Sequence, residues 1–190
     1  MIRLSERFPE MILASQSPAR RSILEKEGVK VTVMATGTDE ACTITDPVER
    51  VRHLALRKLH TFLSLHPSPS LPVLASDTLV SLDGNFLGKA KDWSAAESQL
   101  TLLSGRRHMV ESGWALYHDG MIESGADVAY VTFRELTEAD IRRYLDTDEW
   151  KGAAGSYRIQ GSGAFLVRSV KGDKDTVIGL PLFALRAAFS

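Results

Sequence analysis

Two long extended segments, residues 108–117 and 121–133, stand in the second half of the chain, and His118-Asp119-Gly120 joins them as a hairpin. Elsewhere, short apolar strands alternate with segments of helical periodicity; residues 11–14, for example, precede a helix that ends near Glu27. Because helices and long hairpin strands mix in one chain, the sequence predicts an α/β fold with a mixed β-sheet.

Capping residues mark where the predicted helices start. Ser17 followed by Pro18 begins the first of them, and Asp46-Pro47 begins a helix that runs to about Leu65. Thr137 opens a capping-box start for a helix to about residue 147. The remaining predictions are strands at 29–35, 72–82, 86–87 and 164–170, a helix at 94–104, and a short terminal helix after residue 182.

Length and composition indicate an ordinary globular protein. A chain of 190 residues suits a single domain, 1–190, and a net charge of −1 argues against a general affinity for nucleic acid. Cys42 is the only cysteine, which excludes an intrachain disulfide and a cysteine-based zinc cluster. The start of the chain lacks a secretory pattern, and no run of about 18 apolar residues occurs, so we expect a cytoplasmic protein with no membrane segment.

Two places along the chain suggest an anion site with a nearby acid. The turn from Ser15 to Arg21 would combine hydroxyls, guanidiniums and the free N–H groups of a helix start. An ordinary N-cap with solvated arginines is the alternative. Asp77 interrupts an apolar strand, so it needs a cation or a metal unless it marks the exposed end of that strand.

Lysines and a second acid add to this set. Lys58 falls inside an apolar helical stripe, from which it could either snorkel to solvent or meet an anionic partner. The members of this stripe are Val51, Leu54, Ala55, Phe62 and Leu65. Glu40 and Lys89 lie in loops just after strands, where single charges are usually solvated, and the glycines of residues 152–161 could serve tight turns only. Acids, bases and a helix start together favour phosphoryl chemistry with a divalent cation, Mg²⁺ or Mn²⁺, and water as the attacking group.

The ordered motifs of the chain resemble those of the Maf nucleotide pyrophosphatases, a family with the fold of the inosine triphosphate pyrophosphatases. The resemblance covers about residues 11–182 and rests on five motifs: Leu13-Ala14-Ser15-Gln16-Ser17-Pro18-Ala19-Arg20-Arg21, Ser76-Asp77-Thr78, Leu87-Gly88-Lys89, residues 154–161, and residues 177–181. It implies an α/β domain of two lobes with a deep cleft, usually a homodimer. It also implies hydrolysis of nucleoside triphosphates to the monophosphate and pyrophosphate.

Residue roles follow from the same resemblance, motif by motif. Asp77 matches the catalytic aspartate, the general base on water near the metal, and Glu40 matches the acidic residue on the metal side. The phosphate-side residues are matched by Ser17, Arg20, Lys58 and Lys89.

Three positions bear on base preference. Thr78 and Gln160 resemble the dTTP/UTP type, which also covers modified pyrimidine nucleotides, rather than the 7-methyl-GTP type. Ala19 departs from both, because the pyrimidine type usually has arginine there and the other type tryptophan. A 7-methyl-GTP pyrophosphatase is therefore the alternative in base preference. Two alternatives concern the reaction itself: a phosphatase that removes the γ phosphate, and a non-catalytic nucleotide-binding inhibitor of septum formation.

Overall fold

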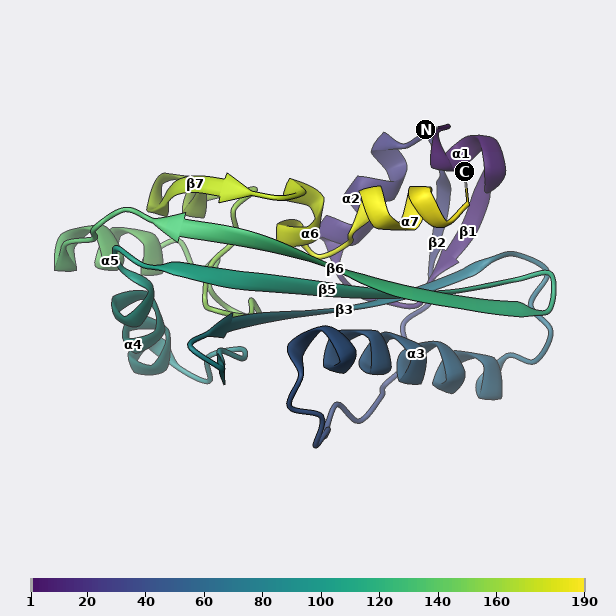
Figure 1. Ribbon diagram of the computed structural model, residues 1–190, viewed down its shortest axis with the longest axis horizontal. Helices are drawn as coiled ribbons and strands as arrows, with labels where there is room; N and C mark the ends of the chain where they lie inside the picture. The colour runs from purple at the N-terminus through teal and green to yellow at the C-terminus, as the bar shows by residue number, and fades with distance from the viewer. Residues whose placement is uncertain (1, 190) are drawn as a thin grey trace. The chain divides into compact units, whose positions relative to one another are not determined.

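The computed structural model describes residues 2–189. Its helices and strands, in chain order, are α1 (Leu4–Arg7), β1 (Glu10–Leu13), α2 (Pro18–Lys26), β2 (Lys30–Val33), α3 (Pro47–Leu65), β3 (Val73–Leu82), β4 (Asn85–Phe86), α4 (Trp93–Leu103), β5 (Arg107–His118), β6 (Met121–Phe133), α5 (Glu138–Leu145), the 3-10 helix η1 (Ser162–Leu166), β7 (Val167–Lys171), α6 (Lys174–Ile178) and α7 (Leu182–Ala188). Figure 1 shows their arrangement.

One seven-stranded sheet runs in the order β2-β1-β3-β5-β6-β7, with the short strand β4 paired to β3. β1 is parallel to both β2 and β3, whereas β6 and β7 are antiparallel, as are β3 and β4. The sheet is therefore mixed, which confirms the predicted α/β class. The parallel pairs arise where a helix separates the strands, since such a crossover returns the chain in the same direction.

The chain divides into two compact units. Unit 1 comprises residues 1–77, 112–127 and 179–190, and unit 2 comprises residues 78–111 and 128–178. The long strands β3, β5 and β6 each contribute residues to both units. Each unit has its own buried apolar side chains, and the two are described separately.

In unit 1, helix α3 packs its apolar face on the strands. The Asp46 side chain caps this helix by accepting from Glu49 N at 2.8 Å. Its buried positions recur every three or four residues, as the sequence predicts, and are Val51, Leu54, Ala55, Leu59 and Phe62. The prediction that Leu65 belongs to the same stripe is wrong, because its side chain in the last turn is 62% exposed. Figure 1 shows α3 on one side of the strands and α7 on the other.

In unit 2, α4 and α5 supply the apolar side chains that meet the strands. The buried set includes Leu100, Leu103, Val131, Phe133, Tyr144 and Leu145. Thr137 begins α5 with the predicted capping box, in which its Oγ1 accepts from Asp140 N at 3.1 Å and the Asp140 carboxylate accepts from Thr137 N at 3.0 Å. These reciprocal bonds use donors that the first turn leaves without helical partners.

The predictions differ from the structure mainly at short elements. The last strand starts at Val167 rather than 164, because residues 162–166 form η1 first. Helices α1 and α6 were not predicted, since four or five residues are too few for a periodic pattern.

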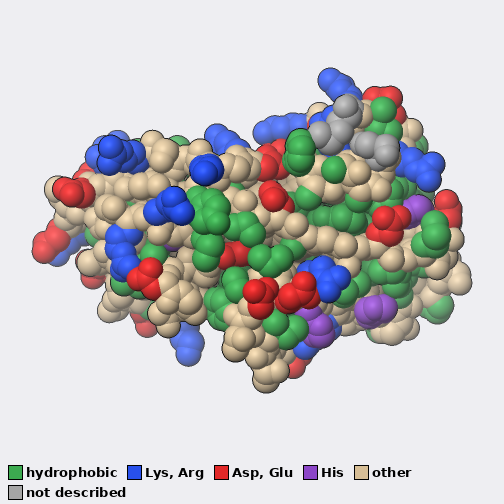
Figure 2. Space-filling view, in the orientation of Figure 1, with side chains coloured by type: hydrophobic (Ala, Val, Ile, Leu, Met, Phe, Trp, Pro, Cys, Tyr) green, Lys and Arg blue, Asp and Glu red, His purple; other side chains and the backbone are tan. Residues whose placement is uncertain are grey.

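Charges of both signs are interspersed on the surface. The chain holds 23 lysines and arginines against 24 acidic residues, and both kinds occur together on the face that Figure 2 draws. That face therefore lacks the single-sign basic stripe typical of nucleic-acid-binding domains. Within residues 2–189, no helix has the length and apolar character needed to cross a membrane.

Candidate active site

Asp77 lies in the middle of β3 and is 8% exposed, and residues 73–76 before it are fully buried. The alternative that Asp77 marks an exposed strand end is therefore wrong. A carboxylate so placed loses much of its hydration and needs a cationic partner. Because β1 and β3 are parallel, the turn that follows β1 and the end of unit 1's part of β3 lie at the same edge of the sheet.

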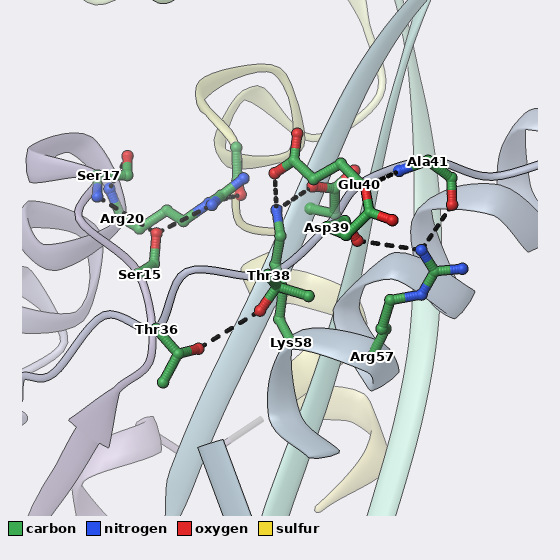
Figure 3. A network of polar contacts seen from close by, with 12 residues as sticks. Ser15, Ser17, Arg20, Thr36, Thr38, Asp39, Glu40, Ala41, Arg57 and Lys58 are labelled. Carbon is green, nitrogen blue, oxygen red and sulfur yellow. Dashed lines mark hydrogen bonds and ion pairs between the residues drawn. The ribbon is translucent and has the colours of Figure 1, made fainter. Parts of the chain in front are cut away.

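The cationic partner of Asp77 is Lys58 on α3. Its Nζ donates to Asp77 Oδ1 and lies 2.7 Å from Glu40 Oε1. The lysine side chain is 15% exposed, so it does not snorkel to solvent; it joins two carboxylates that are far apart in the sequence. Figure 3 shows the Lys58 ammonium beside the Glu40 carboxylate.

Arg20 lies in the first turn of α2, where Ser17 is the N-cap as predicted. Ser17 Oγ accepts from Arg20 N at 3.4 Å, and the guanidinium donates from Nη1 to Ser15 Oγ at 3.0 Å. Its Nε donates to Gly179 O at 2.7 Å, and Ser76 Oγ donates to the same carbonyl at 3.0 Å. Ser15, Ser76 and Gly179 belong to the motifs recognised in the sequence, but their role in holding this arginine was not predicted.

The charges of these side chains influence one another. Burial lowers the pKa of Arg20 below its ordinary value, and the carboxylates of Asp77 and Glu40 oppose that effect. Two cations, Arg20 and Lys58, thus face two anions. Since the local charges cancel, a bound polyphosphate would call for further positive charge.

The two acids fit a divalent cation that binds together with a phosphate ligand. Among residues 2–189, no group of three or more His, Cys, Asp or Glu side chains is arranged to hold a metal ion. Glu40 and Asp77 nevertheless contact the same ammonium, so both carboxylates can reach one cation. Mg²⁺ commonly takes one or two carboxylates and completes its coordination with phosphates and water.

Lys89 belongs to unit 2, where its loop is fastened to the glycine-rich loop. Lys89 forms an isolated bridge with Ala154. The Gln99 side chain links the same two loops, because its Nε2 donates to Gly88 O at 3.0 Å and its Oε1 accepts from Ser156 Oγ at 2.6 Å. The Lys89 side chain itself is exposed.

Gln160 is exposed on a loop of unit 2 that other side chains hold in place. Arg158 donates from Nε to Glu149 O and from Nη2 to Lys151 O, both at 2.8 Å. The Glu149 carboxylate accepts from Ser162 N at 2.8 Å and from Ser162 Oγ at 2.9 Å. Hydrogen bonds therefore hold the loop on either side of Gln160.

The predicted site residues thus fall into two groups. Unit 1 brings together Arg20, Glu40, Lys58 and Asp77, with Ser17 and Ala19 at the start of α2 beside Arg20. Thr78, Lys89 and Gln160 belong to unit 2, and Thr78 follows Asp77 directly in β3.

Comparison with known proteins matches residues 10–190 to the family described as Maf-like protein. The chain belongs to the Maf family. A dTTP/UTP pyrophosphatase of Akkermansia muciniphila is 42% identical to it over 176 residues, which cover 92% of each chain. A dTTP/UTP pyrophosphatase of Pyrococcus abyssi is 41% identical over 172 residues, which cover 90% of each.

Among solved structures, this Maf chain is similar to a nucleoside-triphosphatase, also named a dITP/XTP pyrophosphatase, of Mycobacterium abscessus. The similarity covers 95% of this chain and 94% of the other, at 16% identity and a TM-score of 0.46.

Proposed function

We propose that this Maf protein is a nucleoside triphosphate pyrophosphatase that acts on dTTP and UTP, and on modified pyrimidine triphosphates of similar shape. Water adds to the α phosphorus, the bond from that phosphorus to the bridging oxygen breaks, and the nucleoside monophosphate and pyrophosphate form. The observation that carries the proposal is the contact of Lys58 with both Asp77 and Glu40. The names of relatives about 40% identical support the substrate class.

The predicted site residues would have the following roles in this reaction. Asp77 would accept a proton from the attacking water, since its carboxylate is the buried acid of the group. Lys58 and Arg20 would stabilise the negative charge on the phosphate oxygens. Glu40 and Asp77 would hold a divalent cation, which when bound offsets phosphate charge. Lys89 and Ser17 would contact the phosphates, and Thr78 and Gln160 the base.

Product analysis tests the proposal directly. The purified protein would be incubated with UTP, dTTP, GTP and 7-methyl-GTP, with and without Mg²⁺ or Mn²⁺. We expect UMP and pyrophosphate from UTP, and no orthophosphate. Release of orthophosphate would identify a phosphatase of the γ group instead, and tight nucleotide binding with no product would identify a non-catalytic protein.

Replacing Lys58 with methionine should lower both stability and activity. The change leaves the Asp77 and Glu40 carboxylates facing each other without the ammonium that separates them. Removing one partner of a buried pair costs about 3–5 kcal/mol, and we expect roughly 2 kcal/mol here because Glu40 is half-exposed. Urea unfolding and UTP hydrolysis measure the two effects.

The matched comparison is Lys89→Met, which removes an exposed ammonium. We expect it to lower hydrolysis with little change in the urea midpoint. Equal stability of the two variants would show that the Lys58 ammonium does not stabilise the fold by pairing with Asp77 and Glu40.

Base preference gives a further test. We expect a kcat/KM for UTP roughly tenfold or more above that for 7-methyl-GTP, because Thr78 and Gln160 offer short hydrogen-bonding groups and Ala19 gives no aromatic face for a cationic base. Ala19→Arg should raise this ratio, since it restores the arginine that the pyrimidine type usually has at this position and fills space that alanine leaves for other bases. Faster hydrolysis of 7-methyl-GTP, or an unchanged ratio in the variant, would show that these positions do not select the base.

The proposal also includes a divalent metal, a homodimer and a cytoplasmic location. The paired acids on Lys58 support the metal, and the single cysteine suits a reducing compartment. Dependence of the rate on added Mg²⁺ or Mn²⁺ after chelation tests for the metal. Light scattering of the purified protein tests for the homodimer, and fractionation of the source cells tests the location.

A further inference from the structure

Glu40 lies on a segment that has no helix or strand of its own. This segment begins after β2 ends at Val33 and continues until α3 begins at Pro47. Such a loop samples many conformations unless other groups hold it, and each ordered residue costs conformational entropy. Within the loop, Ala41 N donates to Asp39 Oδ1 at 2.9 Å, and the position of the Glu40 carboxylate beside Lys58 needs a further hold from outside the loop.

Arg57 supplies it, one residue before Lys58 on α3. Its Nη1 donates to Asp39 O at 3.0 Å and to Ala41 O at 2.6 Å, the two carbonyls that flank Glu40. Figure 3 shows the guanidinium reaching both. The same helix turn thus presents the ammonium that the Glu40 carboxylate contacts and the guanidinium that fixes the main chain on each side of it.

Arg50 repeats this arrangement further along the loop. Its Nη1 donates to Cys42 O at 2.7 Å and to Ile44 O at 3.0 Å. Arg50 precedes Arg57 by two helical turns, so both side chains leave α3 on the same side. Together they bond four carbonyls of the loop, those of residues 39, 41, 42 and 44.

A different use of arginine is seen at Arg52 on the same helix. It forms an exposed ion pair with Glu49 at 2.8 Å, in the manner of an ordinary surface side chain. Arg57 instead directs its donors to the main chain of the loop, and its Nη2 lies 3.1 Å from His53 Nε2. Because arginine only donates, the imidazole accepts and helps to orient the guanidinium.

We propose that Arg57, assisted by Arg50, is a positioning residue that holds Glu40 in place for the metal and phosphate groups of the substrate. The inference rests on the proposed function. Arg57 acts through the main chain of the loop, where its guanidinium bonds the Asp39 and Ala41 carbonyls. Groups that orient a metal-side ligand in this way typically matter about 10–100-fold for metal affinity or activity.

The test compares Arg57→Met with Arg52→Met as the matched control. Cys42, the only thiol of the chain, lies in the loop and reports its opening through its rate of reaction with a disulfide reagent. For Arg57→Met we expect faster Cys42 modification, a higher Mn²⁺ concentration for half-maximal UTP hydrolysis, and a loss of about 10–100-fold in kcat/KM. In Arg57→Lys, all three quantities should lie between those of Arg57→Met and the unaltered protein. Arg52→Met should change none of the three.

The remaining outcomes separate this inference from the proposed function. In a Glu40→Gln background, Arg57→Met should cause little further loss of kcat/KM, because Arg57 affects the reaction only through the position of the Glu40 carboxylate. A change in thiol reactivity without a change in hydrolysis, or the reverse, overturns the positioning role. If Glu40→Gln itself leaves UTP hydrolysis unchanged, Glu40 has no part in the reaction and the inference fails for that reason. If no triphosphate is hydrolysed by the unaltered protein, the proposed function fails, and the inference with it.

Discussion

Asp77→Asn should remove most of the turnover while leaving the fold intact. The amide keeps the shape of the carboxylate in the middle of β3, but it cannot accept a proton from water and gives Lys58 no charged partner there. Loss of a general base typically costs about 10²–10⁴-fold in rate. Steady-state hydrolysis of UTP gives the rate, and thermal unfolding gives the stability.

The control for this experiment is Asp83→Asn, the same change six residues further along the chain. Asp83 is exposed and pairs with Arg106 at the turn between β3 and β4. We expect its rate to match the unaltered protein and its stability to stay within about 0.5 kcal/mol, as for most surface substitutions. Full activity in Asp77→Asn would show that another group accepts the proton.

Gly113→Ala should give the largest loss of stability. Gly113 lies in β5 where the main chain of α3 crosses it, and an added Cβ would come within 2.7 Å of Arg52 N and closer still to the Val51 carbonyl. Both are backbone atoms, so no side-chain rotation relieves the clash and the helix must move. Overpacking typically costs about 1–3 kcal/mol, and we expect roughly 3 kcal/mol here. For a chain of this size, that corresponds to a fall in Tm of about 6–12 °C.

Gly37→Ala is the matched control, since an added Cβ there meets no atom within 4 Å. Its Tm should stay close to that of the unaltered protein. Because α3 carries Lys58, the shift forced by Gly113→Ala should also lower UTP hydrolysis. An unchanged Tm in Gly113→Ala would mean that the helix does not approach the strand as closely as the structure has it.

Local chemistry made much of the fold predictable. The capping residues Ser17, Asp46 and Thr137 fixed three helix starts, because each side chain can satisfy amides that the first turn leaves without partners. Alternation and turn residues likewise placed the long hairpin. The Leu65 error arose at the last residue of α3, where the apolar stripe continues in the sequence but the side chain is exposed.

For the site too, the sequence determined some features and the tertiary structure determined others. The sequence by itself singled out Asp77 and Lys58, because a charge in an apolar pattern is costly unless something pairs with it. Glu40, and the roles of all three residues, came from the resemblance of the ordered motifs. What only the tertiary structure decided is which groups pair. Lys58 joins two acids from different segments, and Arg57 bonds the carbonyls on both sides of Glu40. Those contacts depend on how α3 lies against β3 and the loop, and a one-dimensional pattern records burial and periodicity but not the distance between segments far apart in the chain.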